Sequence, residues 1–324
     1  MDSLLFFSGV PDRVIHWNWN SHIKCSDSLY IYQEKYFIMS YPVILDGAMG
    51  TELQNRGVEI PLPLWSADAN IDHPEIITSI HKDYIASGAD IITTNTFRTT
   101  EWTYHRAGLS LIQAKERAKT SLYKAVECAQ MAVSNSIIIA GSVTTIEDCY
   151  SPDKFPGVEV AEEIYGQTLE WIIDAGVDVI IFETMGNIDE ISCGLKMAKK
   201  HNIPLWLSMI AKDKYHLLDG SPFSDVFQLL DGYNVETLLT NCNKIDLSIN
   251  ICDQIISDWR GKWGVYPNLG IEDYENDYFN IISDSKLKDS IKTLLLKKPD
   301  LIGLCCGSTP SHLQNLKHMI NSTR

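Results

Sequence analysis

The sequence predicts an α/β protein of the (β/α)8 TIM barrel class, folded as a single domain. Two observations predict this fold. Short runs that are apolar on both faces recur along the chain, and amphipathic helical segments separate them. Such runs are typical of parallel strands covered by helices. The length of 324 residues and the 45% hydrophobic content provide enough core. A doubly wound sheet is the alternative arrangement of the same elements.

Eight runs have the length and composition of buried strands. The same pattern precedes three of them. A helix ends, a turn residue and Asp follow, and an apolar strand then leads into polar residues. The three stretches are ASGADIITTNT, DAGVDVIIFET and KKPDLIGLCC. This repetition favours a barrel of eight strand–helix units. The predicted strands are 43–47, 90–96, 137–142, 178–184, 204–210, 236–242, 263–268 and 300–305.

The helices between these strands have recognisable ends. Pro74 opens one helix and Gly88 closes it. Ser110 and Gln113 form a capping box before a second helix, and 309–310 (Thr-Pro) begin the last one. Further helices are predicted after Asn187, Pro222, Asp246 and Ser283.

The composition excludes several classes of protein. A net charge of −15 disfavours binding to nucleic acid or anionic lipid and favours small-molecule substrates. No apolar run reaches the 18 residues of a membrane span, and the first ten residues lack the features of a secretory signal. We therefore expect a cytoplasmic protein with reduced cysteines, where grouped cysteines are more often metal-binding or catalytic.

Residues 1–39 differ from the barrel domain predicted for 40–324. The stretch HWNWNSHIKCSDSLYIYQEKYFIM is rich in Trp, Asn and Tyr and has no clean period. We interpret 1–39 as an N-terminal extension. One explanation is that the start codon has been assigned too far upstream of Met39, so that the extension is not part of the native protein. The other is that the extension is an arm that packs on the domain.

Polar residues gather where the predicted strands end. In a (β/α)8 barrel the chemistry lies at the C-terminal ends of the strands, so these side chains are expected to share one rim. They are Asp46 and Gly47, then Thr94, Asn95 and Thr96, then Glu183 and Thr184, then Asn241 and Cys242, then Asn268, and finally Cys305 and Cys306.

The adjacent cysteines Cys305 and Cys306 need a special geometry to act together, because neighbouring side chains of a regular strand point to opposite faces. At a strand end followed by Gly307, both can turn toward one ligand. Cys242 ends a strand two positions away, and strands lie about 4.8 Å apart. With Zn–S bonds of about 2.3 Å, three thiolates and an open fourth position describe a catalytic zinc site.

Two other interpretations of the pair are a packing role as small apolar residues and a vicinal disulfide. The remaining cysteines show no comparable grouping. Cys128, Cys193 and Cys252 fall within helical patterns, and we interpret them, together with Cys25 and Cys149, as core or surface residues.

Seven ordered motifs resemble the homocysteine S-methyltransferase family, over residues 41–321. This group includes betaine–homocysteine methyltransferase and the homocysteine module of cobalamin-dependent methionine synthase. One motif alone would be only suggestive, whereas their joint occurrence is specific. The motifs are LDGAMGTELQNRG (45–57), PLWSA (63–67), SGADIITTNTF (87–97), FET (182–184), TNC (240–242), YPN (266–268) and GLCCGSTPSHL (303–313).

The resemblance implies the barrel fold, a homocysteine acceptor, and zinc held by Cys242, Cys305 and Cys306. It also implies that homocysteine is held at the end of the first strand and by Glu183. The sequence departs from the family at Leu304 and Gly307, where Gly and often Arg are usual. The segment SVTTIEDCYSP (142–152) replaces a Gly-Pro-rich stretch on the methyl-donor side.

An amino-acid substrate needs anchors besides its sulfur. Glu183 can bind the ammonium group, or its carboxylate can instead pair with a buried base. The absence of Lys and Arg from the strand ends favours binding. The backbone N–H groups of Gly47 and Ala48 can take the carboxylate, where small residues allow close approach.

Other rim residues carry two interpretations each. Asp46 either orients its turn or contacts substrate, and Asn268 either binds a substrate or caps a loop. Trp65 either faces a cationic donor through its ring or packs in the core. Thr94 and Asn95 are expected to line the pocket.

Together these residues predict zinc-dependent transfer of a methyl group from an onium donor, S-methylmethionine or S-adenosylmethionine, to the thiol of L-homocysteine, giving methionine. Betaine fits less well, because the longer C-terminal arm of betaine enzymes is missing. Three alternatives stay open: a corrinoid or folate partner acting in trans, another small thiol or selenol as acceptor, and a non-catalytic zinc-binding barrel.

Overall fold

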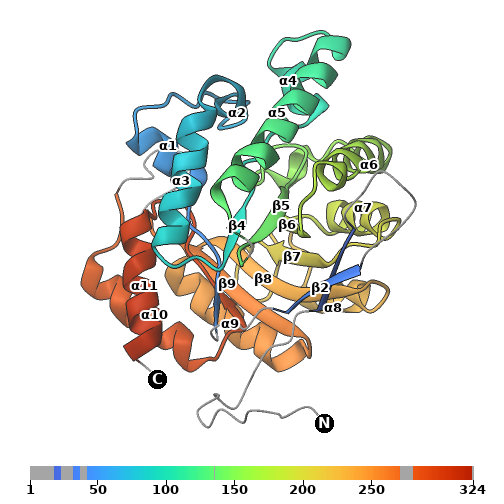
Figure 1. Ribbon diagram of the computed structural model, residues 1–324. Coiled ribbons are helices and arrows are strands. Elements are labelled where there is room, and N and C mark those ends of the chain that lie inside the picture. Colours follow the sequence, from blue (N-terminus) through green and yellow to red (C-terminus); the bar gives the residue numbers. More distant parts are fainter. Residues whose placement is uncertain (1–17, 23–31, 37–41, 135, 271–279, 323–324) are drawn as a thin grey trace, which may run out of the picture.

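The computed structural model describes residues 18–22, 32–36, 42–134, 136–270 and 280–322. Within them, an eight-stranded parallel sheet curls into a barrel with helices around it (Figure 1). The predicted (β/α)8 class is confirmed.

The strands follow one another around the barrel in the order β3-β10-β9-β8-β7-β6-β5-β4. The two ends of this order also meet, because Leu45 bridges Ile91 and the N–H of Asp90 donates to the carbonyl of Ile44 over 2.8 Å. A doubly wound open sheet is therefore excluded. The strands are β3 (Val43–Ile44), β4 (Ile91–Thr93), β5 (Ile138–Val143), β6 (Val179–Met185), β7 (Leu205–Met209), β8 (Val235–Lys244), β9 (Lys262–Asn268) and β10 (Leu301–Ile302).

The predicted helix caps are present. The side chains of Ser110, Asn187 and Ser283 each accept the backbone N–H three residues on, and Ser110 forms the full capping box with Gln113. One start differs, because Asp246 lies inside the first turn of its helix. The helices are α1 (Met49–Asn55), α2 (Ala69–Asp72), α3 (Pro74–Ala86), α4 (Glu101–Arg106), α5 (Leu111–Ala132), α6 (Val158–Asp174), α7 (Ile188–Ala198), α8 (Phe223–Leu230), α9 (Ile245–Asp258), α10 (Asp284–Leu296) and α11 (Pro310–Ser322).

The core has two layers, set by the two-residue period of the strands. Val43, Leu45 and Ile181 belong to a cluster inside the barrel. The alternate residues Ile44 and Ile180 pack in the larger cluster between strands and helices. Each such fully buried side chain stabilises the fold by roughly 1.5–3 kcal/mol.

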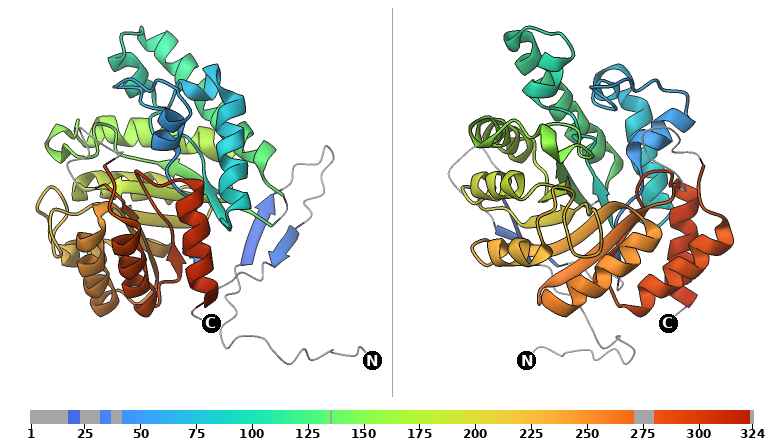
Figure 2. Two further views of the ribbon diagram at one scale, coloured as in Figure 1. Left: turned by 90° about the vertical axis from the view of Figure 1, so that its left-hand side faces the viewer. Right: turned by 180° about the vertical axis from the view of Figure 1, so that it is seen from behind.

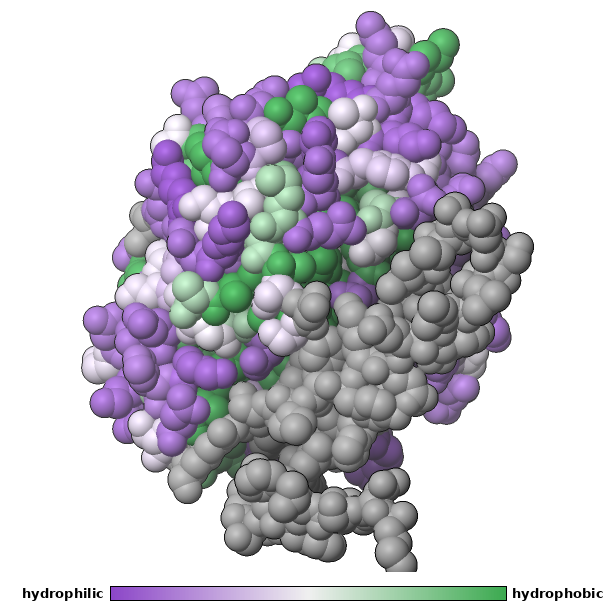
Figure 3. Space-filling view, viewed as in Figure 1, coloured by the Kyte–Doolittle hydropathy of each residue, from purple (hydrophilic) through white to green (hydrophobic). Residues whose placement is uncertain are grey.

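The helices cover the outside of the barrel in all three views (Figures 1 and 2). The coloured part of the face in Figure 3 is largely hydrophilic, with apolar side chains gathered toward the middle of the view. Among the helices described, none is long and apolar enough to cross a membrane.

The predicted N-terminal extension, 1–39, is described only in part. β1 (Asn18–His22) and β2 (Tyr32–Tyr36) form an antiparallel pair with Asn18 opposite Tyr36. The remainder of this segment, Cys25 and Met39 included, lies outside the described residues. The interpretation as an upstream start or a packing arm stays a prediction.

Candidate active site

A cavity of about 610 Å³ opens at the carboxyl ends of the strands, where the sequence predicted the site. Most of the predicted rim residues line it. They are Asp46, Gly47, Thr94, Asn95, Glu183, Thr184, Asn241, Cys242, Cys305 and Cys306, and Ala48 and Trp65 line the cavity as well.

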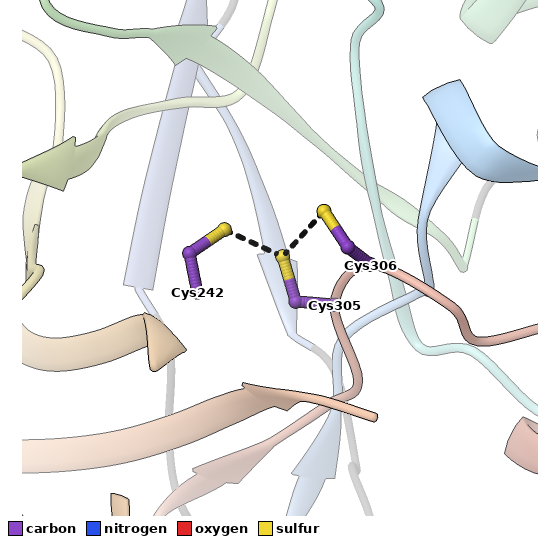
Figure 4. Close-up of side chains that lie close together, drawn as sticks. All are labelled: Cys242, Cys305 and Cys306. Atoms are coloured by element: carbon purple, nitrogen blue, oxygen red, sulfur yellow. Dashed lines mark hydrogen bonds between the residues drawn. The ribbon is translucent and has the colours of Figure 1, made fainter. Parts of the chain in front are cut away.

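Three thiols meet at one point of this cavity (Figure 4). The Sγ atoms of Cys242 and Cys305 lie 2.9 Å apart, and those of Cys305 and Cys306 lie 4.0 Å apart. All three sulfurs fall within 4.8 Å of one another. Cys128, Cys193 and Cys252 are buried within helices, as predicted. Cys149 is also buried, but it lines the same cavity as the three thiols.

Local breaks in strand geometry turn these thiols inward. Along β8 the chain advances three residues, from Asn241 to Lys244, while β9 advances two, which marks a bulge around Cys242. Cys242 has a φ of 54° there. Cys305 and Cys306 follow the end of β10, and Gly307 continues the turn with a φ of 80°.

The three sulfurs fit a tetrahedral metal ion. Zn–S bonds of about 2.3 Å place sulfur ligands about 3.8 Å apart, so Cys242 and Cys305 need to separate by about 0.9 Å from their 2.9 Å contact. Hydrogen bonds from Cys242 and Cys306 lower the pKa of Cys305, whereas the hydrogen bond with Cys305 raises the pKa of Cys242. Cys305 therefore loses its proton first, and a cation at this point would favour loss of the other two.

Glu183 lines the same cavity as the thiols. Its Oε2 accepts a hydrogen bond from the hydroxyl of Tyr266 over 3.2 Å. Burial raises its pKa to about 7, opposed by the hydrogen bond from Tyr266. The structure therefore pairs this carboxylate with a neutral donor and leaves its charge available to a ligand.

Asp46 is buried, and Thr93 holds it. The backbone N–H of Thr93 donates to Oδ2 over 2.9 Å, and the Thr93 hydroxyl donates to Oδ1 over 3.0 Å. Burial raises the pKa of this carboxyl well above its ordinary value. Of its two predicted roles, this geometry supports orientation of the strand end.

The turn at Gly47 and Ala48 is closely packed. A side chain at Gly47 would meet the ring of Tyr84 at 2.6 Å. The N–H of Ala48 donates to the Ser308 hydroxyl over 3.1 Å, and Tyr84 donates to the Ala48 carbonyl over 2.9 Å. The N–H of Ala48 is thus already used within the protein.

Two predicted pocket residues make most of their contacts with the surrounding protein. The Asn95 amide donates to Asn70 Oδ1 over 2.8 Å and accepts from the Ser66 hydroxyl over 2.6 Å. These bonds link α2 to the cavity end of the barrel. Asn268 donates to the carbonyl of Cys242 over 3.0 Å. Asn268 thus positions a thiol rather than capping an outer loop.

Several site residues were not predicted. The loop after β5 brings Tyr150 to the cavity, and Arg98 enters it from the end of β4. Arg98 donates to the carbonyl of Glu147 over 2.9 Å, and Trp102 donates to the Glu147 carboxylate over 2.7 Å. Tyr266 is part of the YPN motif, but only the fold shows that it meets Glu183.

Comparison with known proteins decides the family. The model of the family described as "Homocysteine S-methyltransferase" matches residues 43–320. The chain belongs to the homocysteine S-methyltransferase family. This membership confirms the resemblance seen in the seven motifs and the methyltransferase class predicted from them.

Individual relatives agree with this family membership. The chain is 29% identical over 301 residues to the homocysteine S-methyltransferase of Escherichia coli, covering 85% of this chain and 94% of that protein. It is 27% identical over 301 residues to the homocysteine S-methyltransferase YbgG of Bacillus subtilis, covering 87% and 96%. The crystal structure of the E. coli homocysteine methyltransferase MmuM, metallated form, matches with a TM-score of 0.74 and 28% identity, over 86% of this chain and 96% of that one.

Proposed function

We propose that this chain transfers a methyl group from a sulfonium donor to the thiol of L-homocysteine, giving methionine, with Zn²⁺ held by Cys242, Cys305 and Cys306. The convergence of three thiols in one cavity carries the proposal, and family membership supports the acceptor. Zinc bound there would lower the pKa of a fourth, substrate thiol and keep its sulfur nucleophilic at neutral pH.

The chain's own residues bind and orient the acceptor. Glu183, one wall of the cavity, takes the ammonium group in a charge-assisted hydrogen bond. The turn at Gly47 offers small residues for close approach of the carboxylate. With both ends held, the sulfur attacks the donor's methyl carbon in line; an S–C bond forms while the donor's C–S⁺ bond breaks and its thioether leaves. Fixing both reactants removes much of the entropic barrier.

Three aromatic side chains line the cavity, namely Trp65, Phe97 and Tyr150, and we assign them to the donor. Aromatic faces attract cations by roughly 0.5–2 kcal/mol, which fits an onium donor, and we propose the sulfonium compounds S-methylmethionine or S-adenosylmethionine. Trp65 also packs over Gly50, whose added Cβ would lie 2.4 Å from the indole nitrogen. Packing thus fixes the ring that we assign to the donor. We propose the cytoplasm as the compartment, since a reducing environment keeps such thiols free.

The test is methionine formation from homocysteine, measured with S-methylmethionine, S-adenosylmethionine and betaine in parallel. We expect turnover with a sulfonium donor and far less with betaine. Turnover with betaine alone would contradict the donor assignment. Zinc-loaded protein that uses none of the three would move the assignment to a corrinoid or folate partner or to a non-catalytic barrel.

A further inference from the structure

A member of the thiol cluster, Cys242, and its neighbour Thr184 hold backbone conformations that residues with side chains rarely adopt. Thr184 has a φ of 59° and Cys242 a φ of 54°. Both are buried. This conformation is especially unfavourable for a β-branched residue, so surrounding contacts must hold it in place. A bulge between Phe182 and Met185 places Thr184 at this point.

Asn241 supplies those contacts. Its Oδ1 accepts the backbone N–H of Thr184 over 3.0 Å and the hydroxyl of Ser208 over 2.7 Å. Its Nδ2 donates to Oγ1 of Thr184 over 2.9 Å. Because a backbone N–H can only donate, the orientation of the Asn241 amide is fixed by the network.

The donors and acceptors of this network leave the hydroxyl proton of Thr184 directed at the sulfur of Cys242. The Thr184 hydroxyl carries a single proton, and its oxygen already accepts from Asn241. Its proton therefore has the Sγ of Cys242, 3.9 Å away, as its acceptor. Cys305 differs, because the hydrogen bonds of its sulfur join it to the other two thiols, Cys242 and Cys306.

We propose that Thr184 is a positioning residue whose hydroxyl hydrogen-bonds to the Cys242 thiolate, and that Asn241 orients this hydroxyl. The consequence is selectivity between sulfurs in a methyl-transfer site. A thiolate that accepts a hydrogen bond is a weaker nucleophile, so Cys242 stays a ligand instead of competing with the substrate for the methyl group. This inference rests on the thiolate site of the proposed function.

Methyl iodide tests the inference on the full-length, zinc-loaded protein. When a cysteine reacts, its sulfur lone pair forms an S–CH₃ bond, the C–I bond breaks and iodide leaves. Limited treatment followed by peptide mass spectrometry gives the methylation of Cys242 relative to Cys305 and Cys306. In Thr184→Val we expect this ratio to rise roughly tenfold, the scale of one hydrogen bond to a charged group. Thr184→Ser, which keeps the hydroxyl, restores the wild-type ratio.

Two further variants keep the test decisive. Asn241→Asp retains an acceptor for the Thr184 N–H but offers the hydroxyl a second acceptor, so it should raise the ratio as Thr184→Val does. Thr237→Val is the matched control, because that buried hydroxyl lies earlier on the same strand, β8, with no hydrogen-bond partner among the described residues. An unchanged ratio in folded Thr184→Val and Asn241→Asp would overturn the inference.

Zinc content and methionine formation are measured on the same samples. Zinc-loaded wild-type protein that shows no turnover with any donor overturns the proposed function. The methylation ratio still decides the role of Thr184 in that case, because the hydroxyl is directed at the sulfur itself.

Discussion

The hydroxyl of Tyr266 lies 3.2 Å from Oε2 of Glu183, and joins two strands that are not neighbours in the barrel. Glu183 belongs to β6 and Tyr266 to β9, with β7 and β8 between them. The bond therefore crosses the cavity end of the barrel beside the thiols. It orients the carboxylate that we assign to the substrate ammonium group.

Replacing Glu183 by Gln should weaken homocysteine binding selectively. The amide keeps the shape but loses the charge that pairs with the ammonium group. We expect kcat/KM for homocysteine to fall roughly 10–100-fold, the scale of a hydrogen bond between charged groups of 1.5–3 kcal/mol, with most of the change in KM. Steady-state kinetics measure this effect.

The matched control is Glu236→Gln, at the opposite end of the barrel near the start of β8. This variant should keep the wild-type kinetics. Equal KM values for homocysteine in Glu183→Gln and the wild type would remove Glu183 from the binding site.

The pH profile of kcat/KM should report the titration of Glu183. Burial raises its pKa to about 7, so the carboxylate gains a proton, and loses its charge, as the pH falls through 7. Homocysteine methylation should therefore decline below about pH 7 in the free enzyme. Tyr266→Phe removes a hydrogen bond that lowers this pKa, so the acid limb should move to higher pH. An acid limb at an unchanged pH in Tyr266→Phe contradicts this assignment.

His81, on the buried face of α3, should make the fold acid-sensitive. Neither ring nitrogen has a hydrogen-bond partner among the described residues, and burial lowers its pKa from 6.5 to about 4. Below pH 6.5 His81 is protonated in the unfolded chain but stays neutral in the folded chain. The free energy of unfolding therefore falls as the pH drops from 6.5 to 4. The loss at pH 5 is about 2 kcal/mol.

His81→Leu removes this titration and should flatten the profile over that window. Urea unfolding of wild type and variant at pH 7.5 and pH 5 measures the difference. If the two proteins lose the same free energy of unfolding between these pH values, His81 is not the source of the acid sensitivity.

The sequence was sufficient to predict the barrel and the place of the site. Buried parallel strands read as apolar runs, and those runs end in polar residues that the fold brings to one rim. The predicted runs 43–47 and 300–305 shrink to two residues each, because the chain turns at Asp46 and Cys305 to place their side chains in the cavity.

The sequence could not predict contacts that depend on register. The bulges at Thr184 and Cys242 arise because one strand gains a residue relative to its neighbour, which no local pattern reports. Asn95 was expected to line the pocket, and it does, but most of its hydrogen bonds go to Ser66 and Asn70. Such partners lie far apart in the sequence and meet only in the fold.

The zinc content of the purified protein tests the central claim most directly. Cys305 lies between the other two thiols, 2.9 Å from Cys242 and 4.0 Å from Cys306, so its loss should open the site. We predict about one zinc per chain in wild type and in the control Cys128→Ala, and a loss of zinc together with methionine formation in Cys305→Ala. No zinc in wild-type protein purified under reducing conditions, or full zinc in Cys305→Ala, would contradict this account.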